Sequence, residues 1–353
     1  MTSSNCVDCN ANIGRGSCFS RSSKLLNCAA CNNSICSKCA NDQALIPYTS
    51  NNEEPMPIKK SSIKCYCKSC YQSVSTLDYS RTYDTIEPAA DEADKNTNTT
   101  LLWLHGGGGC RNMFIPHSKY LSNQGYRSIL IDLPGHGTLV DTKLTLDECV
   151  ATVQSVLQKE CKSSQKIIYI GGSLGAYIGF YILGKLNAQF SGAVLIDCGQ
   201  NVGPDCSLKA RLGIWFLRKL STNMSNKALM GAMMGAVKKS KADYHLVETA
   251  FGAGYFFQQG GALCDCMHTV APANIIPSLD FPILFFNGSE DYRDSEDKWL
   301  DLCKHKELSS LKVYEGGDHF FCHDSRFVHD MLDRVDRFIQ AVPSVDGTTL
   351  FVE

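Results

Sequence analysis

Short apolar runs recur along the chain from residue 100 onward, and each closes with glycine, aspartate or asparagine. Continuous apolar runs rich in β-branched and aromatic residues are typical of strands that are buried on both faces of a sheet. The pattern predicts strands in TLLWLHGG (100–107), YRSILIDLPG (126–135), KIIYIGG (166–172), GAVLIDC (192–198), FPILFFNG (281–288) and LKVYEGG (311–317). RTYDTIEP (81–88) is a further candidate, as the first strand of the same unit.

Stretches with helical periodicity separate these runs. TLDECVATVQSVLQKEC (145–161) opens with a capping box from Thr145 to Glu148, and RFVHDMLDRVDRFIQAV (326–342) is the last stretch of this kind. Strands that alternate with helices predict an α/β fold, with a mostly parallel sheet covered by helices on both faces. Ligands of such sheets bind beyond the carboxyl ends of the strands, so the turns that contain glycine and histidine are expected to share one edge.

The interval between the fourth and fifth runs, residues 200–278, is far longer than a single crossover connection. It contains LKARLGIWFLRKL (208–220) and KALMGAMMGAVKKSKADYHLVETAFGAGYFF (227–257), both compatible with helices and rich in methionine and aromatic residues. We therefore predict a helical insertion. Its methionines suit either a helix core or an adaptable apolar pocket.

Composition divides the chain into two parts of unequal size. Ten of the 19 cysteines lie in the first 70 residues, and from residue 73 to 100 the sequence becomes polar and rich in turn formers. We predict a small cysteine-rich domain at 1–72 and a linker with the candidate first strand at 73–99. The main domain is predicted at 100–345 and includes the insertion at 200–278.

The overall charge argues against one class of partner. The 353 residues have a formal net charge of −2, which provides no basic field for nucleic acid. No apolar run reaches the roughly 18 residues of a membrane-spanning helix, and MTSSNCVDCN (1–10) lacks the layout of a secretion signal. The expected compartment is the cytosol, where reducing conditions suit paired cysteines that bind metal.

Four Cys-x-x-Cys pairs lie in the cysteine-rich domain. Each pair lets two sulfurs converge on one ion, and zinc takes four such ligands in a tetrahedron, so eight thiolates predict two closed structural zinc sites. A segment of about 70 residues has a small core, and each zinc is expected to add on the order of 10 kcal/mol of folding free energy. The predicted ligands are Cys6, Cys9, Cys28, Cys31, Cys36, Cys39, Cys67 and Cys70, with Cys18 left over and Cys65 an open alternative to Cys67.

The order and spacing of NCAACNNSICSKCA (27–40) and CYCKSCYQSV (65–74) resemble the FYVE-type zinc finger. The resemblance implies interleaved pairs, with one ion on Cys6, Cys9, Cys36 and Cys39 and the other on Cys28, Cys31, Cys67 and Cys70.

That family contacts phosphatidylinositol 3-phosphate through a run of arginine and histidine before the third cysteine. Here the run is SSKLLNC (22–28) with Lys24 as its one cation, and the WxxD motif before the first cysteine is absent. One cation cannot supply the charge-assisted hydrogen bonds that a phosphate needs. We expect the finger to be an adaptor that contacts a protein rather than a phosphoinositide.

A Gly-x-Ser-x-Gly motif, Gly171–Gly175, follows one predicted strand and precedes the helix-compatible LGAYIGFYILGKL (174–186). A strand-turn-helix context of this kind is required for a nucleophile elbow, in which small residues surround a serine in a strained turn. Ser173 is therefore predicted to be a nucleophile rather than a loop serine.

A serine hydroxyl needs a base to take its proton. His319, in YEGGDHFF (314–321), lies just beyond the last predicted strand and is the predicted base. Surface or capping positions are predicted for His305, His323 and His329.

The acid that orients the base is expected after the preceding strand, in FFNGSEDYRDSED (285–297). Asp291, three residues past Gly288, is the predicted acid. Most of the other acids there are predicted to form a solvated face, and Asp197, after an earlier strand, is the alternative. The remaining candidates are Glu290, Asp294, Glu296 and Asp297.

Two backbone amides are needed to stabilise a developing oxyanion. Leu174, directly after the serine, and Gly107, in the run of four glycines at 106–109, are the predicted donors. A phosphate-binding P-loop is excluded, because Cys110-Arg111 follows the glycines where Lys-Ser/Thr is required.

Taken together, WLHGGGG, DLPGHG (132–137), GGSLG, NGSED and GGDHF resemble the α/β-hydrolase superfamily in order and spacing, over about residues 75–345. The resemblance implies a triad of Ser173, Asp291 and His319, with Gly107 and Leu174 as oxyanion donors. It also implies that His136 belongs to a structural turn, and that the insertion is a helical cap whose apolar lining selects the acyl or leaving group.

The prediction is a serine hydrolase that cleaves an ester, lipid ester, thioester or amide through an acyl-enzyme. The substrate is expected to be a small molecule or a lipid ester, zinc is expected only in the finger, and no cofactor is expected for catalysis. The alternative is a non-catalytic binding or scaffold protein, recruited through its finger to an endosomal membrane or a protein complex. An aspartate nucleophile is excluded, because Ser173 occupies the elbow.

Overall fold

A computed structural model describes most of the region after residue 64 and short segments before it. The described residues are 4–5, 7–8, 12–13, 25–36, 44–45, 64–91, 96, 98–162, 165–239, 253–257 and 259–343. Among them, no helix combines the length and apolar character needed to cross a membrane.

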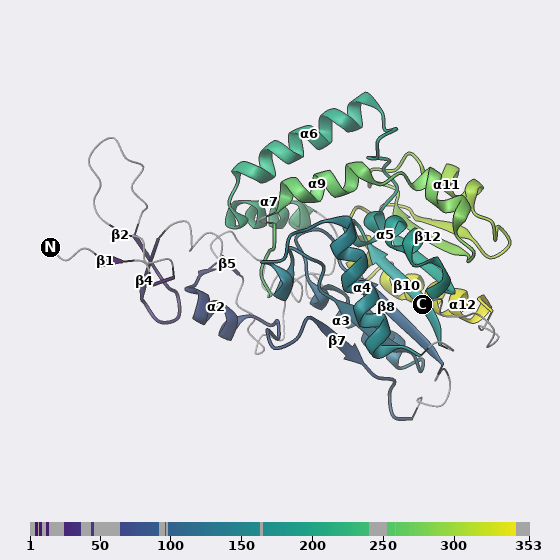
Figure 1. Cartoon of the computed structure of the whole chain (residues 1–353), viewed down its shortest axis with the longest axis horizontal. Coiled ribbons are helices and arrows are strands. Elements are labelled where there is room, and N and C mark those ends of the chain that lie inside the picture. The colour runs from purple at the N-terminus through teal and green to yellow at the C-terminus, as the bar shows by residue number, and fades with distance from the viewer. Residues whose placement is uncertain are drawn as a thin grey trace.

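A seven-stranded sheet forms the centre of the molecule (Figure 1), in the order β13-β12-β11-β10-β8-β9-β7. All neighbours are parallel except β7, which is antiparallel to β9. The six predicted strands and the candidate first strand are confirmed. Their bounds are β7 (Tyr83–Ile86), β8 (Thr99–Leu104), β9 (Arg127–Ile131), β10 (Lys166–Gly172), β11 (Gly192–Ile196), β12 (Ile283–Gly288) and β13 (Ser310–Tyr314).

Helices cover both faces of this sheet. Alternate strand residues point to opposite faces, so Ile167 and Tyr169 of β10 belong to one apolar core while Ile168 and Ile170 belong to the other. The first core includes residues of α4 and α5, and the second includes residues of α3 and α12. The bounds are α3 (Ile115–Ser122), α4 (Leu146–Glu160), α5 (Leu174–Lys185), α11 (Glu296–Leu302) and α12 (Val328–Ala341).

The chain changes direction across the sheet at β8. It passes from β8 outward to β9 and then returns to β10 on the other side of β8. Loops at the carboxyl ends of β8 and β10 therefore diverge, and ligands of open parallel sheets bind at such a switch point. The glycine run follows β8, and Ser173 follows β10.

The predicted insertion lies between β11 and β12 and is largely helical (Figure 1). It contains α6 (Leu208–Asn223), α7 (Asn226–Lys239), α9 (Gly260–Thr269) and α10 (Pro272–Ile275). The prediction of helix through residue 257 is wrong for 253–257. Gly254 adopts a φ of 112°, outside the helical region, and Phe256 forms a β-bridge with Gly108 instead.

The N-terminal region consists of short elements. These are the antiparallel pairs β1 (Ser4–Asn5) with β2 (Asn12–Ile13), β3 (Leu25–Asn27) with β4 (Ser34–Cys36) and β5 (Ala44–Leu45) with β6 (Lys64–Cys65), followed by α2 (Lys68–Val74). Its buried apolar cluster is small and consists of Cys28, Ile35, Tyr66, Cys67 and Tyr71. A cluster of this size provides much less hydrophobic stabilisation than the two cores of the main sheet.

Candidate active site and cysteine cluster

Ser173 lies in a sharp turn between β10 and α5, with φ 50° and ψ −110°. A positive φ is strained for a residue that has a Cβ, and such strain is typical of functional turns. The flanking glycines are required by contact. A Cβ at Gly171 would lie 2.6 Å from the carbonyl oxygen of Gly175, and a Cβ at Gly175 would lie 2.5 Å from that of Leu104.

Three residues predicted as a triad lie in one hydrogen-bonded row. Nε2 of His319 lies 3.0 Å from Oγ of Ser173, and Nδ1 of His319 lies 2.8 Å from Oδ2 of Asp291. Oδ1 of Asp291 also accepts a 2.7 Å hydrogen bond from the backbone N–H of Tyr292. A carboxylate can only accept, so Nδ1 donates its proton to Asp291 and Nε2 is left to accept the serine proton.

The surroundings of His319 set its basicity. Removal from water in the pocket lowers the pKa of His319, but the hydrogen bond and negative charge of Asp291 outweigh that effect and raise the pKa above its usual value. The side chain of Asp291 is only 13% exposed, so its charge is screened less than that of a surface group. His319 is a stronger base here than in water.

Asp197, the alternative acid, lies close to the same histidine. One atom each of Asp197, Asp291 and His319 lies within 4.8 Å of the other two. Burial, together with the charges of Asp291, Glu296 and Asp318, raises the pKa of Asp197 well above its usual value. Among the described residues, its Oδ1 has no hydrogen-bond partner.

The other predicted acids have separate surroundings. Asp294 accepts hydrogen bonds from the N–H of Asn201 and the hydroxyl of Ser295, and Asp297 pairs with Arg293 at 3.0 Å. The prediction of a solvated face is wrong for Glu296, which is 1% exposed and packs so closely on Gly199 that a Cβ there would lie 2.5 Å from its Cδ. Burial raises the pKa of Glu296 to about 8.

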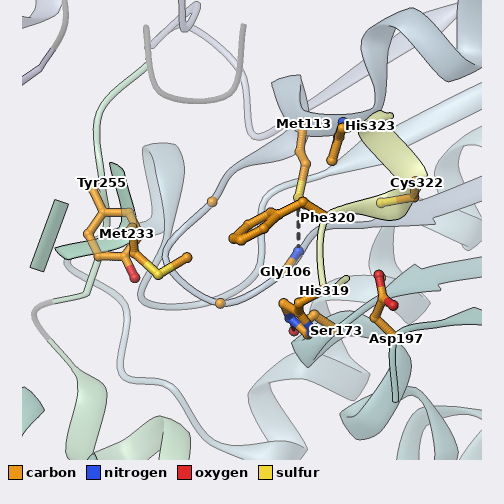
Figure 2. Close-up of a pocket in the computed structure, with 13 residues that line it drawn as sticks. Gly106, Met113, Ser173, Asp197, Met233, Tyr255, His319, Phe320, Cys322 and His323 are labelled. Carbon is orange, nitrogen blue, oxygen red and sulfur yellow. Dashed lines mark hydrogen bonds between the residues drawn. The ribbon is translucent and has the colours of Figure 1, made fainter. Parts of the chain in front are cut away.

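The two predicted oxyanion donors lie side by side. A Cβ at Gly107 would lie 3.7 Å from the Cβ of Leu174. Leu174 is the first residue of α5, so its N–H has no partner inside the helix and lies at the positive end of the helix dipole. The backbone N–H of the neighbouring Gly106 already has an acceptor. It donates to the sulfur of Met113 at 3.3 Å, as Figure 2 shows.

Buried polar contacts hold the glycine run in place. Burial lowers the pKa of His105 to about 4, so its ring is neutral. One ring nitrogen lies 2.8 Å from the carbonyl oxygen of Gly106, and the other accepts from the N–H of Leu133 at 3.0 Å. His136, expected in a structural turn, is buried beside His105, with ring centroids 5.0 Å apart.

An apolar cavity of about 650 Å³ opens next to Ser173 (Figure 2). Its walls come from both the main domain and the insertion, so no single stretch of sequence predicts it. The apolar side chains that line it are Met113, Met233, Tyr255 and Phe320.

His323 also lines this cavity, and the prediction of a surface position for it is wrong. The ring is 2% exposed and stacks on Phe114, with centroids 6.0 Å apart. Burial lowers the pKa of His323 well below its usual value, and the ring is neutral. The two phenylalanines before it, Phe320 and Phe321, were the available sequence signal for a buried turn.

A second cavity of about 390 Å³ also reaches the triad. Ser173 and His319 line both cavities. The second cavity is more polar, with Tyr177, Asp197, Gln200, Asp291 and Tyr292 among its walls. The candidate nucleophile therefore borders both an apolar space and a polar one.

Four cysteines of the N-terminal region form a second cluster. The sulfurs of Cys28, Cys31, Cys67 and Cys70 all lie within 4.8 Å of one another, and those of Cys31 and Cys67 are 3.7 Å apart. A tetrahedral ion with metal–sulfur bonds of about 2.3 Å has sulfur–sulfur edges of about 3.8 Å. The cluster therefore has the size and ligand type of a metal site.

Local backbone structure brings these thiols together. Cys28 and Cys31 lie in the turn between β3 and β4, and Cys67 and Cys70 lie at the start of α2. Burial raises the pKa of the Cys28 thiol, but hydrogen bonds from nearby backbone amides, including those of Cys31 and Cys67, lower it to about 6. A thiolate, the form that binds metal, is favoured at that position.

The other predicted zinc ligands lie either outside this cluster or outside the described residues. Cys67 rather than Cys65 belongs to the cluster, and the sulfur of Cys65 accepts a 3.3 Å hydrogen bond from Lys227 of α7. Cys6, Cys9, Cys18 and Cys39, with Lys24, lie outside the described residues, and only the backbone of Cys36 is described.

The cysteine cluster and the apolar cavity are joined by one short segment. The hydroxyl of Tyr71, in α2, donates to the carbonyl oxygen of Ala253 at 3.2 Å, and that of Ser75 does so at 3.1 Å. Two residues later Tyr255 lines the cavity, and Phe256 donates its N–H to Gly108 in the glycine run at 2.9 Å. The helix that supplies two of the thiols thus contacts the segment that forms the cavity wall.

Comparison with known proteins identifies the main domain. A model of the alpha/beta hydrolase family matches residues 101–334, more than half of the chain. None of the curated proteins matches the sequence.

Several solved structures have a similar fold. MenH from S. aureus is 16% identical with a TM-score of 0.57, covering 73% of this chain and 98% of its own. A thermophilic esterase from Thermogutta terrifontis is 15% identical with a TM-score of 0.56, covering 74% and 93%. The esterase from Exiguobacterium antarcticum is 14% identical with a TM-score of 0.57, covering 73% and 95%.

Proposed function

Because this chain belongs to the alpha/beta hydrolase family, we propose that it is a serine hydrolase that cleaves carboxylic esters through an acyl-enzyme. One observation supports this most strongly. Oγ of Ser173, in a strained turn, lies 3.0 Å from Nε2 of His319. The other ring nitrogen, Nδ1, lies 2.8 Å from Oδ2 of Asp291. A nucleophile, a base and an orienting acid in hydrogen-bond contact are the parts that acyl transfer requires.

The first half of the reaction transfers the acyl group to the serine. Oγ of Ser173 attacks the ester carbonyl while Nε2 of His319 takes its proton. Asp291 holds the ring in the right tautomer and stabilises the imidazolium. The amides of Gly107 and Leu174 donate to the oxyanion, and His319 then gives its proton to the leaving alkoxide, which departs as the alcohol.

The second half returns the serine to its starting state. A water molecule gives a proton to Nε2 of His319 and attacks the acyl carbon. The same two amides again stabilise the oxyanion. When the intermediate collapses, the bond to Oγ breaks, the proton returns to Ser173 and the carboxylic acid is released.

The cavities support an ester with an apolar acyl group, such as a lipid ester. Met113, Met233, Tyr255 and Phe320 offer a lining that adapts to an alkyl chain. The polar cavity that also reaches Ser173 suits the alcohol part.

We also propose that zinc binds Cys28, Cys31, Cys67 and Cys70 as a structural ion in a FYVE-like finger that acts as an adaptor. Four sulfur ligands leave no open position for catalysis, so the ion would stabilise the fold. Selective, zinc-dependent recruitment of the protein to vesicles that contain phosphatidylinositol 3-phosphate, and hence to endosomal membrane, would contradict the adaptor role.

A fluorophosphonate probe tests the hydrolase directly, because it labels serines that a neighbouring base has activated. We expect the full chain to be labelled and Ser173→Ala to lose labelling. Ser278 is exposed, and its hydroxyl donates to the carbonyl oxygen of Ile275 in the same turn. Ser278→Ala is the matched control and should be labelled like the parent. Absence of labelling in the parent would favour the alternative of a binding or scaffold protein.

Hydrolysis of p-nitrophenyl esters of increasing acyl length tests the substrate class. We expect kcat/KM to rise from acetyl to medium-chain acyl groups, because each buried CH₂ contributes about 0.8 kcal/mol. A steady decline with length would contradict the assignment of the apolar cavity to the acyl group, without affecting the nucleophile.

A further inference from the structure

Helix α6, in the insertion, has an unusually apolar exposed surface. Of the nine large apolar side chains that are exposed in the described part of the chain, six lie on this one helix. They are Leu208, Leu212, Trp215, Phe216, Leu217 and Leu220. In Figure 1, α6 is the outermost helix along the top of the molecule, with α9 beneath it.

Exposed side chains surround most of α6, and only a narrow inner face is buried. Ala210 and Ser221 are 6% and 4% exposed and belong to the inner face. Leu208, Leu212 and Trp215, at spacings of three and four residues, share the outer face and are 71%, 59% and 57% exposed. The helix is therefore already packed on its inner side, and the outer apolar face is additional to what the fold needs.

Positive charge accompanies this apolar face. The sequence of α6, LKARLGIWFLRKLSTN, contains four basic residues and no acidic one. Arg218 pairs with Asp265 of α9 at 3.1 Å. Lys219 lies over the ring of Trp215, with its Nζ 5.9 Å from the ring centroid, and long lysine side chains of this kind can extend past apolar neighbours to reach charged headgroups.

We propose that the outer face of α6 binds the surface of an anionic phospholipid membrane. An amphipathic helix with Trp, Phe and Leu on one face and Lys and Arg beside them is the pattern of helices that lie in the membrane interface. The cations complement anionic headgroups, while the apolar side chains enter the boundary with the acyl chains.

The same features disfavour the other occupants. A second copy of this chain, paired face to face through α6, would bring like charges together. An apolar groove on a partner protein would have to desolvate the ammonium groups of Lys209 and Lys219, which stand among the apolar residues of the outer face. A fluid lipid surface accommodates both the lysines and the apolar side chains.

The position of α6 relates the surface to the candidate active site. Nζ of Lys209, near the start of the helix, lies 5.3 Å from the ring centroid of Tyr292. Tyr292 is 50% exposed and lines the polar cavity that reaches Ser173. Resting on the proposed function, this geometry places a membrane-bound α6 beside the entrance for an ester of a lipid. The binding itself does not depend on catalysis.

Tryptophan fluorescence of the full chain gives a direct test. The protein has three tryptophans, and Trp103 and Trp299 are 1% and 2% exposed, so Trp215 alone is available to lipid. With phosphatidylcholine vesicles that contain phosphatidylserine, we expect a blue shift of the emission and quenching by brominated acyl chains. Trp215→Phe should keep binding and lose both signals. An emission spectrum unchanged by vesicles to which the protein binds would overturn the proposal.

Co-sedimentation with the same vesicles separates the contributions. Leu212→Ser with Phe216→Ser, and separately Lys209→Glu with Lys219→Glu, should each weaken binding at least about tenfold. High salt should weaken it as well. Leu302→Ser, which removes an exposed leucine on α11, is the matched control and should bind like the parent.

Three results would overturn the proposal. They are binding that survives both double substitutions, binding that disappears when metal is chelated from the cysteine cluster, and a dimer in vesicle-free solution that the Leu212/Phe216 substitutions dissociate. Fluorophosphonate labelling measured in parallel distinguishes this failure from failure of the hydrolase proposal, because labelling requires Ser173 and not a membrane.

Discussion

The chain contains two clusters of reactive side chains, and they are supported in different ways. The cysteine cluster joins Cys28 and Cys31 to Cys67 and Cys70, and the row of Ser173, Asp291 and His319 also joins residues that are distant in sequence. The row stands at the edge of a seven-stranded sheet between two large apolar cores. The buried apolar cluster that the described residues form beside the cysteines is much smaller.

The two clusters also differ in how their polar atoms are paired. In the row, every polar atom has a complementary neighbour: hydroxyl to imidazole, imidazole to carboxylate, and carboxylate to backbone N–H. In the cysteine cluster, four thiols of the same kind face one another, and deprotonation would add like charges. We therefore expect the candidate active site to be preformed by the fold, and we expect the order of the cysteine cluster to depend on the metal proposed for it.

Metal removal should have the largest effect, and it should be confined to one region. We expect chelation to abolish the protection of residues 64–74 against hydrogen exchange, because a structural zinc supplies on the order of 10 kcal/mol to such a region. Fluorophosphonate labelling of Ser173 should persist. Metal analysis and hydrogen-exchange mass spectrometry measure both parts.

Cys31→Ser should reproduce this effect without a chelator. Cys161→Ser, at a half-buried cysteine beyond α4, is the control and should leave metal content and protection unchanged. Equal protection against hydrogen exchange in the metal-loaded and metal-free proteins would show that the cysteine site is preformed. The two clusters would then not differ in this respect.

Replacement of the two acids near His319 should give unequal effects. Asp291→Asn is expected to lower kcat by about 10³–10⁴-fold, because an amide donor favours the wrong tautomer of His319. Asp197→Asn should change it less than about tenfold, because Nδ1 of His319 bonds Asp291 rather than Asp197 and Asn has the same shape as Asp. Steady-state kinetics on a p-nitrophenyl ester measure both, and the reverse order would make Asp197 the acid.

The dependence of kcat/KM on pH should show the effect of Asp291 on His319 as a smaller change. Asp291 raises the pKa of His319, and the reaction needs the neutral ring, so kcat/KM should fall about tenfold per pH unit below that raised pKa. In Asp291→Asn the pKa of His319 falls, and the acid limb should move to lower pH. An acid limb at the same pH in both proteins would contradict the assignment of this limb to the pair.

Loss of the contact between the cysteine region and the segment at 253–257 should have the smallest effect on stability and activity. Tyr71→Phe removes the 3.2 Å hydrogen bond to Ala253 and is expected to cost about 1 kcal/mol. The loss should appear as faster hydrogen exchange near 253–257, with activity reduced less than about threefold. Tyr181→Phe, which removes an exposed hydrogen bond to Asp147, is the control. A large loss of activity in Tyr71→Phe would mean that the cysteine region controls the active site.

Much of the fold was predictable because local pattern and fold agree. The continuous apolar runs of β8 and β10 require burial on both faces, and Thr145 caps α4 through its side chain as its capping box predicts. The insertion was less predictable. Residues 253–257 follow a helix-compatible pattern, but Gly254 and pairing with Gly108 give them an extended path.

Local sequence determined the chemistry that each turn can offer. The small residues around Ser173, the thiol pairs and the glycine run follow from spacing alone, because turns of this kind tolerate few residue types. Which of them meet was decided by tertiary structure. Burial raised the pKa values of Asp197 and Glu296, while Asp291 bonds His319 and His323 lies in the cavity wall. Sequence patterns cannot determine these outcomes, because burial and the pKa shifts that it causes depend on residues distant in the chain.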